Sequence, residues 1–134
     1  MSRLIVMNRI LFELPIPSSA LTRGPSLVAL PQRQCELSFY VESEDGDRKM
    51  GFIFEGVEAY KCTYMTARTV DMINVAYDKL VRLQDTPWLA EVRANSTSYY
   101  VSRQGAPKDL QHLIICFDDG PCYEVLCANV RPLS

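Results

Sequence analysis

A run of five consecutive apolar residues at positions 113–117 constrains the fold of this chain more than any other feature. The run is short and rich in β-branched residues, so it predicts a strand that is covered on both faces. It is followed by Asp119-Gly120, a strong signal for a two-residue hairpin turn, because both residues tolerate a positive φ. Residues 112–130 are therefore predicted to form the innermost β-hairpin of an α+β domain.

The turn also predicts a register for this hairpin. With Asp119-Gly120 as the loop, Ile114 pairs with Val125 and His112 pairs with Cys127. A bulge at the turn would shift this register by one residue and exchange the two faces.

Residues 35–55 predict a second hairpin, with its turn at positions 45–46. This register pairs Leu37 with Phe54 and places all the large apolar side chains on one face, with polar side chains on the other. The other apolar pairs in this register are Phe39 with Phe52 and Val41 with Met50.

The region before and after this hairpin is less regular. Residues 4–13 could form a strand or a short helix that ends before two prolines, and the strand is favoured. Residues 15–34 are interpreted as a long connection rich in proline. Connections of this length are usually functional or mobile, and the alternative is a strap lying across the core. Residues 57–65 are predicted to form a third strand.

Two helices are predicted in the second half of the chain. Apolar side chains recur at helical spacing over residues 67–83, and Thr66 is the expected N-cap of this long helix. A short helix is expected to be capped by Asp85 or Thr86, with Pro87 in its first turn, and to run through Trp88 to about residue 95. Residues 96–109 are expected to be irregular, with a short edge strand at 99–101.

Composition narrows the functional classes. The chain has 134 residues, which is the size of a single domain spanning 1–134, and 48% of them are hydrophobic, as in a folded protein. A net charge of −2 disfavours a nucleic-acid binder. No apolar run is long enough to span a membrane, and we expect no signal peptide. Five cysteines without a C-x-x-C pair indicate reduced, structural thiols in a cytoplasmic protein and no zinc site.

Several tyrosines form the candidate interaction surface. If the outer face of the sheet presents Tyr40, Tyr60 and Tyr64, it offers an amphipathic contact surface beside the acidic residues Glu42 and Glu58. Tyrosine presents both an apolar ring and a hydroxyl, which suits a protein interface. Trp88 is a second candidate for this surface, and its alternative role is to close the core between helix and sheet.

Two further groups of residues are candidate ligand or thiol sites. His112 beside Cys127 could activate a thiolate, although the sequence shows no third residue or oxyanion-hole motif. Asp118 and Asp119 could hold a metal ion at the tip of the hairpin, but two aspartates before a glycine are also what a turn requires. We therefore predict no catalytic residue, cofactor or metal site.

Four short strings resemble small, poorly characterised bacterial proteins, some of them similar to the immunity proteins that neutralise contact-dependent toxins. The resemblance covers about residues 35–128 and implies no catalytic residue or other site residue. The strings are F-x-F-x-x-V-x-x-Y at 52–60, Y-D-x-L-V at 77–81, P-W-L at 87–89 and F-D-D-G-P-C-Y-E at 117–124.

The sequence thus predicts an α+β fold, in which an antiparallel sheet of about five strands carries one long helix on one face and a short second helix. The leading functional hypothesis is a non-enzymatic protein-binding module, either an immunity-type inhibitor or a self-associating accessory protein. One alternative is a small-ligand or metal-binding module that uses the Asp118/Asp119 tip or a pocket under residues 15–34. Another is a cysteine-dependent enzyme or redox sensor that uses Cys127 or Cys122.

Overall fold

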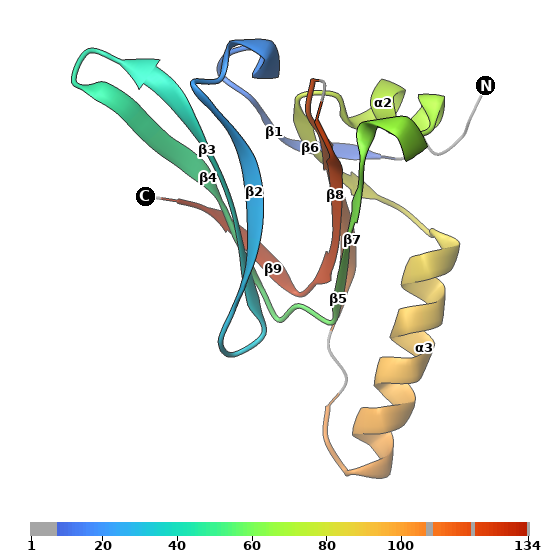
Figure 1. The fold of residues 1–134 in the computed structure, drawn as a ribbon. Coiled ribbons are helices and arrows are strands. Elements are labelled where there is room, and N and C mark those ends of the chain that lie inside the picture. Colours follow the sequence, from blue (N-terminus) through green and yellow to red (C-terminus); the bar gives the residue numbers. More distant parts are fainter. Residues whose placement is uncertain (1–7, 107–108, 119, 134) are drawn as a thin grey trace.

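Two antiparallel sheets pack face to face, and two helices cover the outer face of one of them (Figure 1). The computed structural model describes residues 8–106, 109–118 and 120–133. The helices are α2 (Val70–Ala76) and α3 (Pro87–Ser102), and two 3-10 turns are η1 (Ser18–Ala20) and η2 (Met65–Ala67). The strands are β1 (Arg9–Glu13), β2 (Arg23–Leu30), β3 (Gln34–Ser43), β4 (Gly46–Glu55), β5 (Ala59–Thr63), β6 (Lys79–Leu83), β7 (Gln111–Cys116), β8 (Cys122–Cys127) and β9 (Asn129–Pro132).

The strands divide into a five-stranded sheet, ordered β1-β6-β7-β8-β5, and a four-stranded sheet, ordered β2-β3-β4-β9. The α+β class and the antiparallel pairing are confirmed, whereas the prediction of a single sheet of about five strands is wrong. The two predicted hairpins each supply the centre of a different sheet. Residues 57–65 do contain a strand, but β5 pairs with β8 rather than extending the sheet of β3 and β4.

The main core lies between the two sheets. Leu37 and Phe39 of β3 face Leu113 and Ile115 of β7, and all four are buried. The Phe39 ring lies 5.8 Å from that of Phe117, which joins the two sheets through an aromatic contact. Residues 112–116 of β7 and all residues of β8 are buried on both faces, because α2 and α3 cover the side that faces away from the other sheet. This explains the unbroken apolar run from which the hairpin was predicted.

The hairpin registers differ from the predicted ones. In the β3–β4 hairpin Leu37 pairs with Phe52, a shift of two residues that leaves the predicted faces unchanged. In the β7–β8 hairpin the shift is one residue, so His112 pairs with Leu126 and Cys127 pairs with Gln111. The expected pair of His112 and Cys127 is therefore wrong, and the two side chains lie on opposite faces of the sheet.

The long helix predicted at 67–83 is also wrong. Thr69, not Thr66, caps α2 through its hydroxyl, and this helix ends at Ala76. Asp78 then adopts a φ of 58°, which turns the chain into β6. Leu80 and Val81 are adjacent and both buried, on opposite faces of a central strand, so their apolar character reflects two layers of core rather than one helical face.

The second helix is longer than predicted. Of the two candidate caps, Thr86 is the one that caps α3, because its hydroxyl accepts a hydrogen bond from Leu89 N–H. Pro87 is the first helical residue. The helix continues to Ser102, so the predictions of an irregular segment at 96–109 and a strand at 99–101 are wrong. The C-terminal half of α3 extends beyond the sheets (Figure 1). It packs on no sheet there, so its sequence lacks the apolar face from which an amphipathic helix is predicted.

Two other expectations are corrected. The connection at 15–34 contains the eight-residue strand β2, which pairs with β3. The cysteines are not all reduced, because Cys116 and Cys122 pair directly at the end of the β7–β8 hairpin and form a disulfide. Cys35, Cys62 and Cys127 are free, and of these only Cys62 is exposed.

Candidate interaction site at the edge of the five-stranded sheet

Strand β5 forms one edge of the five-stranded sheet, and β8 is its only partner strand in the described part of the chain. In Figure 1 this sheet is seen from its side, with β5 in front. Tyr60 is 48% exposed, and Tyr64, one residue beyond the strand, is 70% exposed. An open edge presents unpaired backbone N–H and C=O groups, and here exposed aromatic rings flank it.

The two faces of β5 differ. Tyr60 and Cys62 pair with Val125 and Tyr123, so they lie on the face that is directed toward the four-stranded sheet. Burial raises the pKa of the neighbouring Tyr123 to about 12, and proximity to Cys62 and Tyr64 contributes. On the opposite face Lys61 Nζ lies 4.3 Å from the centre of the Trp88 ring.

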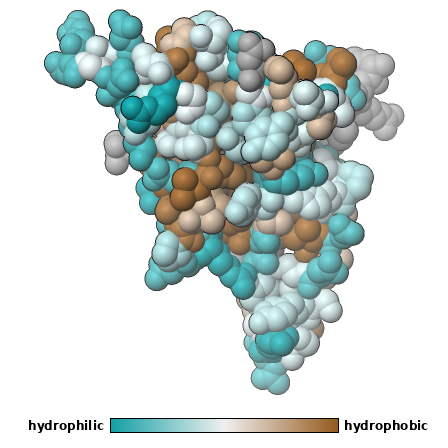
Figure 2. All heavy atoms as spheres, viewed as in Figure 1, coloured by the Kyte–Doolittle hydropathy of each residue, from teal (hydrophilic) through white to brown (hydrophobic). Residues whose placement is uncertain are grey.

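An apolar hollow of about 380 Å³ lies between the end of β2 and the start of β5. We call it the sheet hollow. Figure 2, which has the same view as Figure 1, shows hydrophobic residues gathered in this part of the face, between the two sheets. The residues that line the sheet hollow are Ala29, Leu30, Arg33, Gln34, Cys35, Val57, Glu58, Ala59 and Tyr60.

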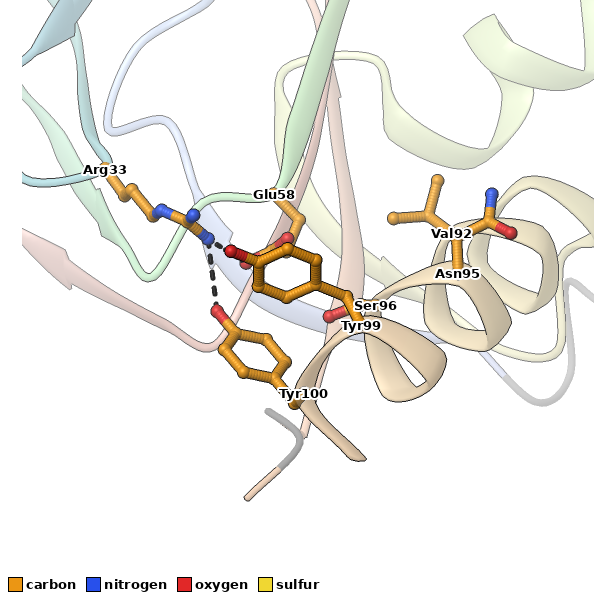
Figure 3. A pocket seen from close by; sticks show the side chains of 7 residues that line it. All are labelled: Arg33, Glu58, Val92, Asn95, Ser96, Tyr99 and Tyr100. Atoms are coloured by element: carbon orange, nitrogen blue, oxygen red, sulfur yellow. Dashed lines mark hydrogen bonds and ion pairs between the residues drawn. The ribbon is translucent and has the colours of Figure 1, made fainter. Parts of the chain in front are cut away.

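A second hollow of about 270 Å³, the helix cleft, adjoins the first and separates it from α3. Arg33 and Glu58 line both hollows, and Arg33 Nη1 lies 2.7 Å from Glu58 Oε2. The same nitrogen donates a hydrogen bond to the Tyr100 hydroxyl at 3.2 Å (Figure 3). The other residues that line the helix cleft are Val92, Asn95, Ser96 and Tyr99.

The β2–β3 turn holds Arg33 in this position. Gln32 and Arg33 both have a positive φ, of 62° and 57°, although neither is glycine. Such conformations are uncommon for residues with a side chain and are stabilised by their surroundings. Here the contacts of Arg33 with Glu58 and Tyr100 connect the turn to the residue before β5 and to α3. The charge of Glu58 raises the pKa of Arg33.

Ser96 is the polar group of the helix cleft that remains unsatisfied. The side chain is only 8% exposed, and its hydroxyl has no hydrogen-bond partner among the described residues. A buried hydroxyl without a partner is unfavourable, so a group from a bound molecule would be stabilised there.

The candidate thiol and histidine site is closed. His112 is 3% exposed; its Nδ1 lies 2.7 Å from Thr86 Oγ1, and its Nε2 lies 2.9 Å from Glu124 Oε1. Both ring nitrogens are thus occupied beneath the N-terminus of α3, with the Trp88 ring against the imidazole. Burial raises the pKa of Cys127 to about 12 on the opposite face of the sheet, so this thiol is not ionised near neutral pH.

The structure does not bring the predicted tyrosine surface together. Tyr60 and Tyr64 lie at the β5 edge as a pair of exposed rings. Tyr40 lies on the outer face of the other sheet, where the Arg23 guanidinium stacks 4.7 Å from its ring. Trp88 is half-buried in the first turn of α3, where it packs against the cluster of Leu89, Leu110 and Leu126.

Only one residue of the predicted aspartate tip is described by the structure. Asp118 accepts a hydrogen bond from the Tyr77 hydroxyl at 2.9 Å, and Asp119 lies outside the described residues. Over the residues that the structure describes, no three His, Cys, Asp or Glu side chains are grouped in a way that could hold a metal ion. Within the same residues, neither helix has the length and apolar character needed to cross a membrane.

Sequence reasoning missed the helix cleft. The sequence predicts an irregular connection around Arg33 and a segment without helical structure around Ser96, Tyr99 and Tyr100, whereas the structure has a turn and the continuation of α3 there. The adjacent tyrosines were visible in the sequence, but only a helix that continues past residue 95 brings Tyr100 toward Arg33.

Known proteins offer no further guide to this site. Comparison with protein-family models, with curated proteins and with solved structures gave no match.

Proposed function

We propose that this chain is a non-enzymatic protein-binding module and that the β5 edge, with the sheet hollow and the helix cleft beside it, is its binding site. The observation that carries the proposal is the open edge of β5 between two exposed tyrosines, Tyr60 and Tyr64. An extended segment of a partner gains main-chain hydrogen bonds when it pairs with such an edge.

The surroundings of the edge supply the features of a protein interface. The sheet hollow offers an apolar space for a partner side chain, and the Arg33–Glu58 ion pair forms a polar rim beside it. Interfaces commonly combine a desolvated apolar centre with aromatic anchors and a polar rim. The tyrosines of β5 provide such anchors.

The geometry favours binding over catalysis. His112, the one histidine of the chain, has both ring nitrogens occupied in a buried network. Cys127 is buried on the other face of the sheet. Neither residue is open to a substrate, which supports a protein that acts through its surface, as an immunity-type inhibitor or a self-associating protein would.

Site-specific photo-crosslinking in cells of its source tests the proposal. A benzophenone amino acid is introduced at Tyr60 and, as a matched control, at Tyr40 on the outer face of the four-stranded sheet. We expect a defined covalent adduct with a protein from position 60 and none from position 40. Equal labelling at both positions, or no protein adduct at position 60, would contradict the proposed site.

A small-ligand module is the second candidate, and the unpartnered Ser96 hydroxyl in the helix cleft favours it. Native mass spectrometry of the purified protein separates the two candidates. A retained small molecule that is lost in Ser96→Ala supports a ligand site, because alanine removes the hydroxyl without filling the cleft.

A further inference from the structure

We infer that the partner of β5 is β5 of a second copy of this chain, paired antiparallel about a two-fold axis at Cys62. The inference rests on the proposed function, since it names the occupant of the same edge. Such a pair would join the two five-stranded sheets into one continuous sheet. Two-fold pairs of this kind use the same surface of both copies and form a closed dimer.

The residues of β5 restrict the possible registers. In an antiparallel pair each residue lies opposite a residue on the same face of the sheet. Because successive residues of a strand alternate between the faces, a two-fold pair of identical strands places one residue opposite its own copy. The two-fold axis passes between these two residues. An axis at Lys61 would place Tyr60 of each copy opposite Cys62, and Tyr64 opposite Glu58, which precedes the strand. This register leaves both exposed tyrosines without an aromatic partner across the strands.

An axis at Tyr60 is excluded by the shape of the chain. It would require residues before Ala59 to continue the strand, with Glu58 opposite Cys62 and Gly56 opposite Tyr64. The chain turns at Gly56, which has a φ of 63°, and Val57 is buried in the core. The edge cannot extend in that direction.

An axis at Cys62 meets neither obstacle. It places Tyr60 of each copy opposite Tyr64 of the other, and Lys61 opposite Thr63. Aromatic pairs across strands are stabilising, and the lysine faces no like charge. Tyr64 has extended backbone angles, with φ −73° and ψ 163°, so the edge continues one residue past β5 before η2 begins.

The exposed side chains of the edge agree with this register. Tyr60 and Tyr64 are both exposed, and Tyr60 lies on the face of the sheet that carries Cys62. Because Tyr64 continues the extended strand and lies near Tyr123, the partner of Cys62, it belongs to the same face. Lys61 already lies over Trp88 and 3.9 Å from Glu124 Oε2 in its own protomer, which directs its charge away from the axis. The buried edge is short, so we expect a dimer that dissociates on dilution.

Cysteine cross-linking tests the register directly. Residues opposite each other on antiparallel strands have Cα atoms about 4.5–5.5 Å apart, which is within the range for a disulfide. Diamide removes two protons and two electrons from a pair of thiols and is itself reduced to the hydrazine. Oxidation of the full chain is therefore expected to join two copies through Cys62, and Cys62→Ser is expected to lose this product.

Two further variants in the Cys62→Ser background define the pairing. Tyr60→Cys and Tyr64→Cys should each give little cross-linked product alone but should cross-link when the two proteins are mixed. Glu44→Cys, in the exposed β3–β4 turn, is the matched control and should not cross-link with either. Efficient self-crosslinking of Tyr60→Cys would overturn the register, because it would place the axis at Tyr60.

Light scattering supplies a measurement that needs no thiol. The mass of the Cys62→Ser protein should rise with concentration from 15.2 kDa toward twice that value. A mass that stays at one chain, with no Cys62 cross-link in the unmodified protein, would overturn self-pairing. A photo-adduct from Tyr60 with a different protein would then leave the proposed binding function in place, whereas its absence as well would remove both.

Discussion

His112 is a buried residue, and both of its ring nitrogens have hydrogen-bond partners. It lies under the N-terminus of α3, between the Thr86 hydroxyl and the Glu124 carboxylate. The Thr86 oxygen already accepts the Leu89 N–H, so its own proton is free to donate to His112 Nδ1. A tautomer with the proton on Nε2 then donates to Glu124, and each of these groups is satisfied. This network resembles a catalytic relay in composition, but its burial makes it a connection between helix and sheet.

The first prediction concerns Thr86, which both caps α3 and bonds His112. We expect Thr86→Ala to lower the free energy of unfolding by about 1–3 kcal/mol, because it removes a cap and leaves a buried ring nitrogen without a partner. Thr86→Ser keeps the hydroxyl and should cost clearly less. Urea denaturation of the three proteins measures the difference. Equal losses in the two variants would mean that the methyl packing, not the hydroxyl, is what stabilises this position.

At the scale of elements, the sequence predicted those features that depend on neighbouring residues. The turn signals located both hairpins, alternation gave the correct faces for β3 and β4, and Thr86-Pro87 marked the start of α3. Exact registers were not predicted. The strands β7 and β8 are buried on both faces, so their apolar pattern does not distinguish two registers that differ by one residue.

The elements that were predicted wrongly lack the apolar periodicity by which a helix or a strand is recognised. In β6 this periodicity is lost because the strand is buried on both faces. Leu80 and Val81 face two different layers of core, so β6 gave a spacing that could be taken for the end of a helix. The far half of α3 has the opposite problem, since it contacts little and shows no apolar face. The candidate site was predicted where exposed aromatics mark a strand, at Tyr60 and Tyr64. It was missed where distant segments meet, as in the contact of Arg33 with Tyr100.

The second prediction concerns the disulfide that closes the β7–β8 hairpin. Cys116 and Cys122 are six residues apart, and closing so short a loop restricts the unfolded chain by about 2 kcal/mol on the loop-entropy account. The double variant Cys116→Ala/Cys122→Ala should lose stability of this order in urea. A reductant should lower the stability of the parent protein and leave the double variant unchanged. A parent protein that is insensitive to a reductant able to reduce the bond would contradict this contribution.

At the scale of the whole molecule, the packing of the two sheets favours the neutral form of the ionisable groups buried between them. Burial raises the pKa of Cys127 to about 12 from its ordinary value of 9.0, and burial raises that of Tyr123 to about 12 from 10.0. Burial also raises the pKa of Cys35, which lies in the same core. Both sheets therefore contribute groups whose neutral form the fold favours. Because of these groups, the free energy of unfolding is expected to depend on pH in the alkaline range.

The sign of this dependence follows from proton counting. Between the ordinary and the raised pKa the unfolded chain has lost a proton that the folded chain retains, so stability falls as pH rises. We expect the free energy of unfolding to be insensitive to these groups below pH 9. Above it, stability should decline toward pH 12, by at most about 1.4 kcal/mol per pH unit for each group. Cys127→Ala should remove the part of the slope that begins near pH 9, and Tyr123→Phe the part that begins near pH 10. Urea denaturation at a series of pH values measures these slopes, and lysine ionisation cancels when each variant is compared with its parent. Parallel curves for parent and variants from pH 9 to 11 would show that neither group is held neutral by the packing of the two sheets.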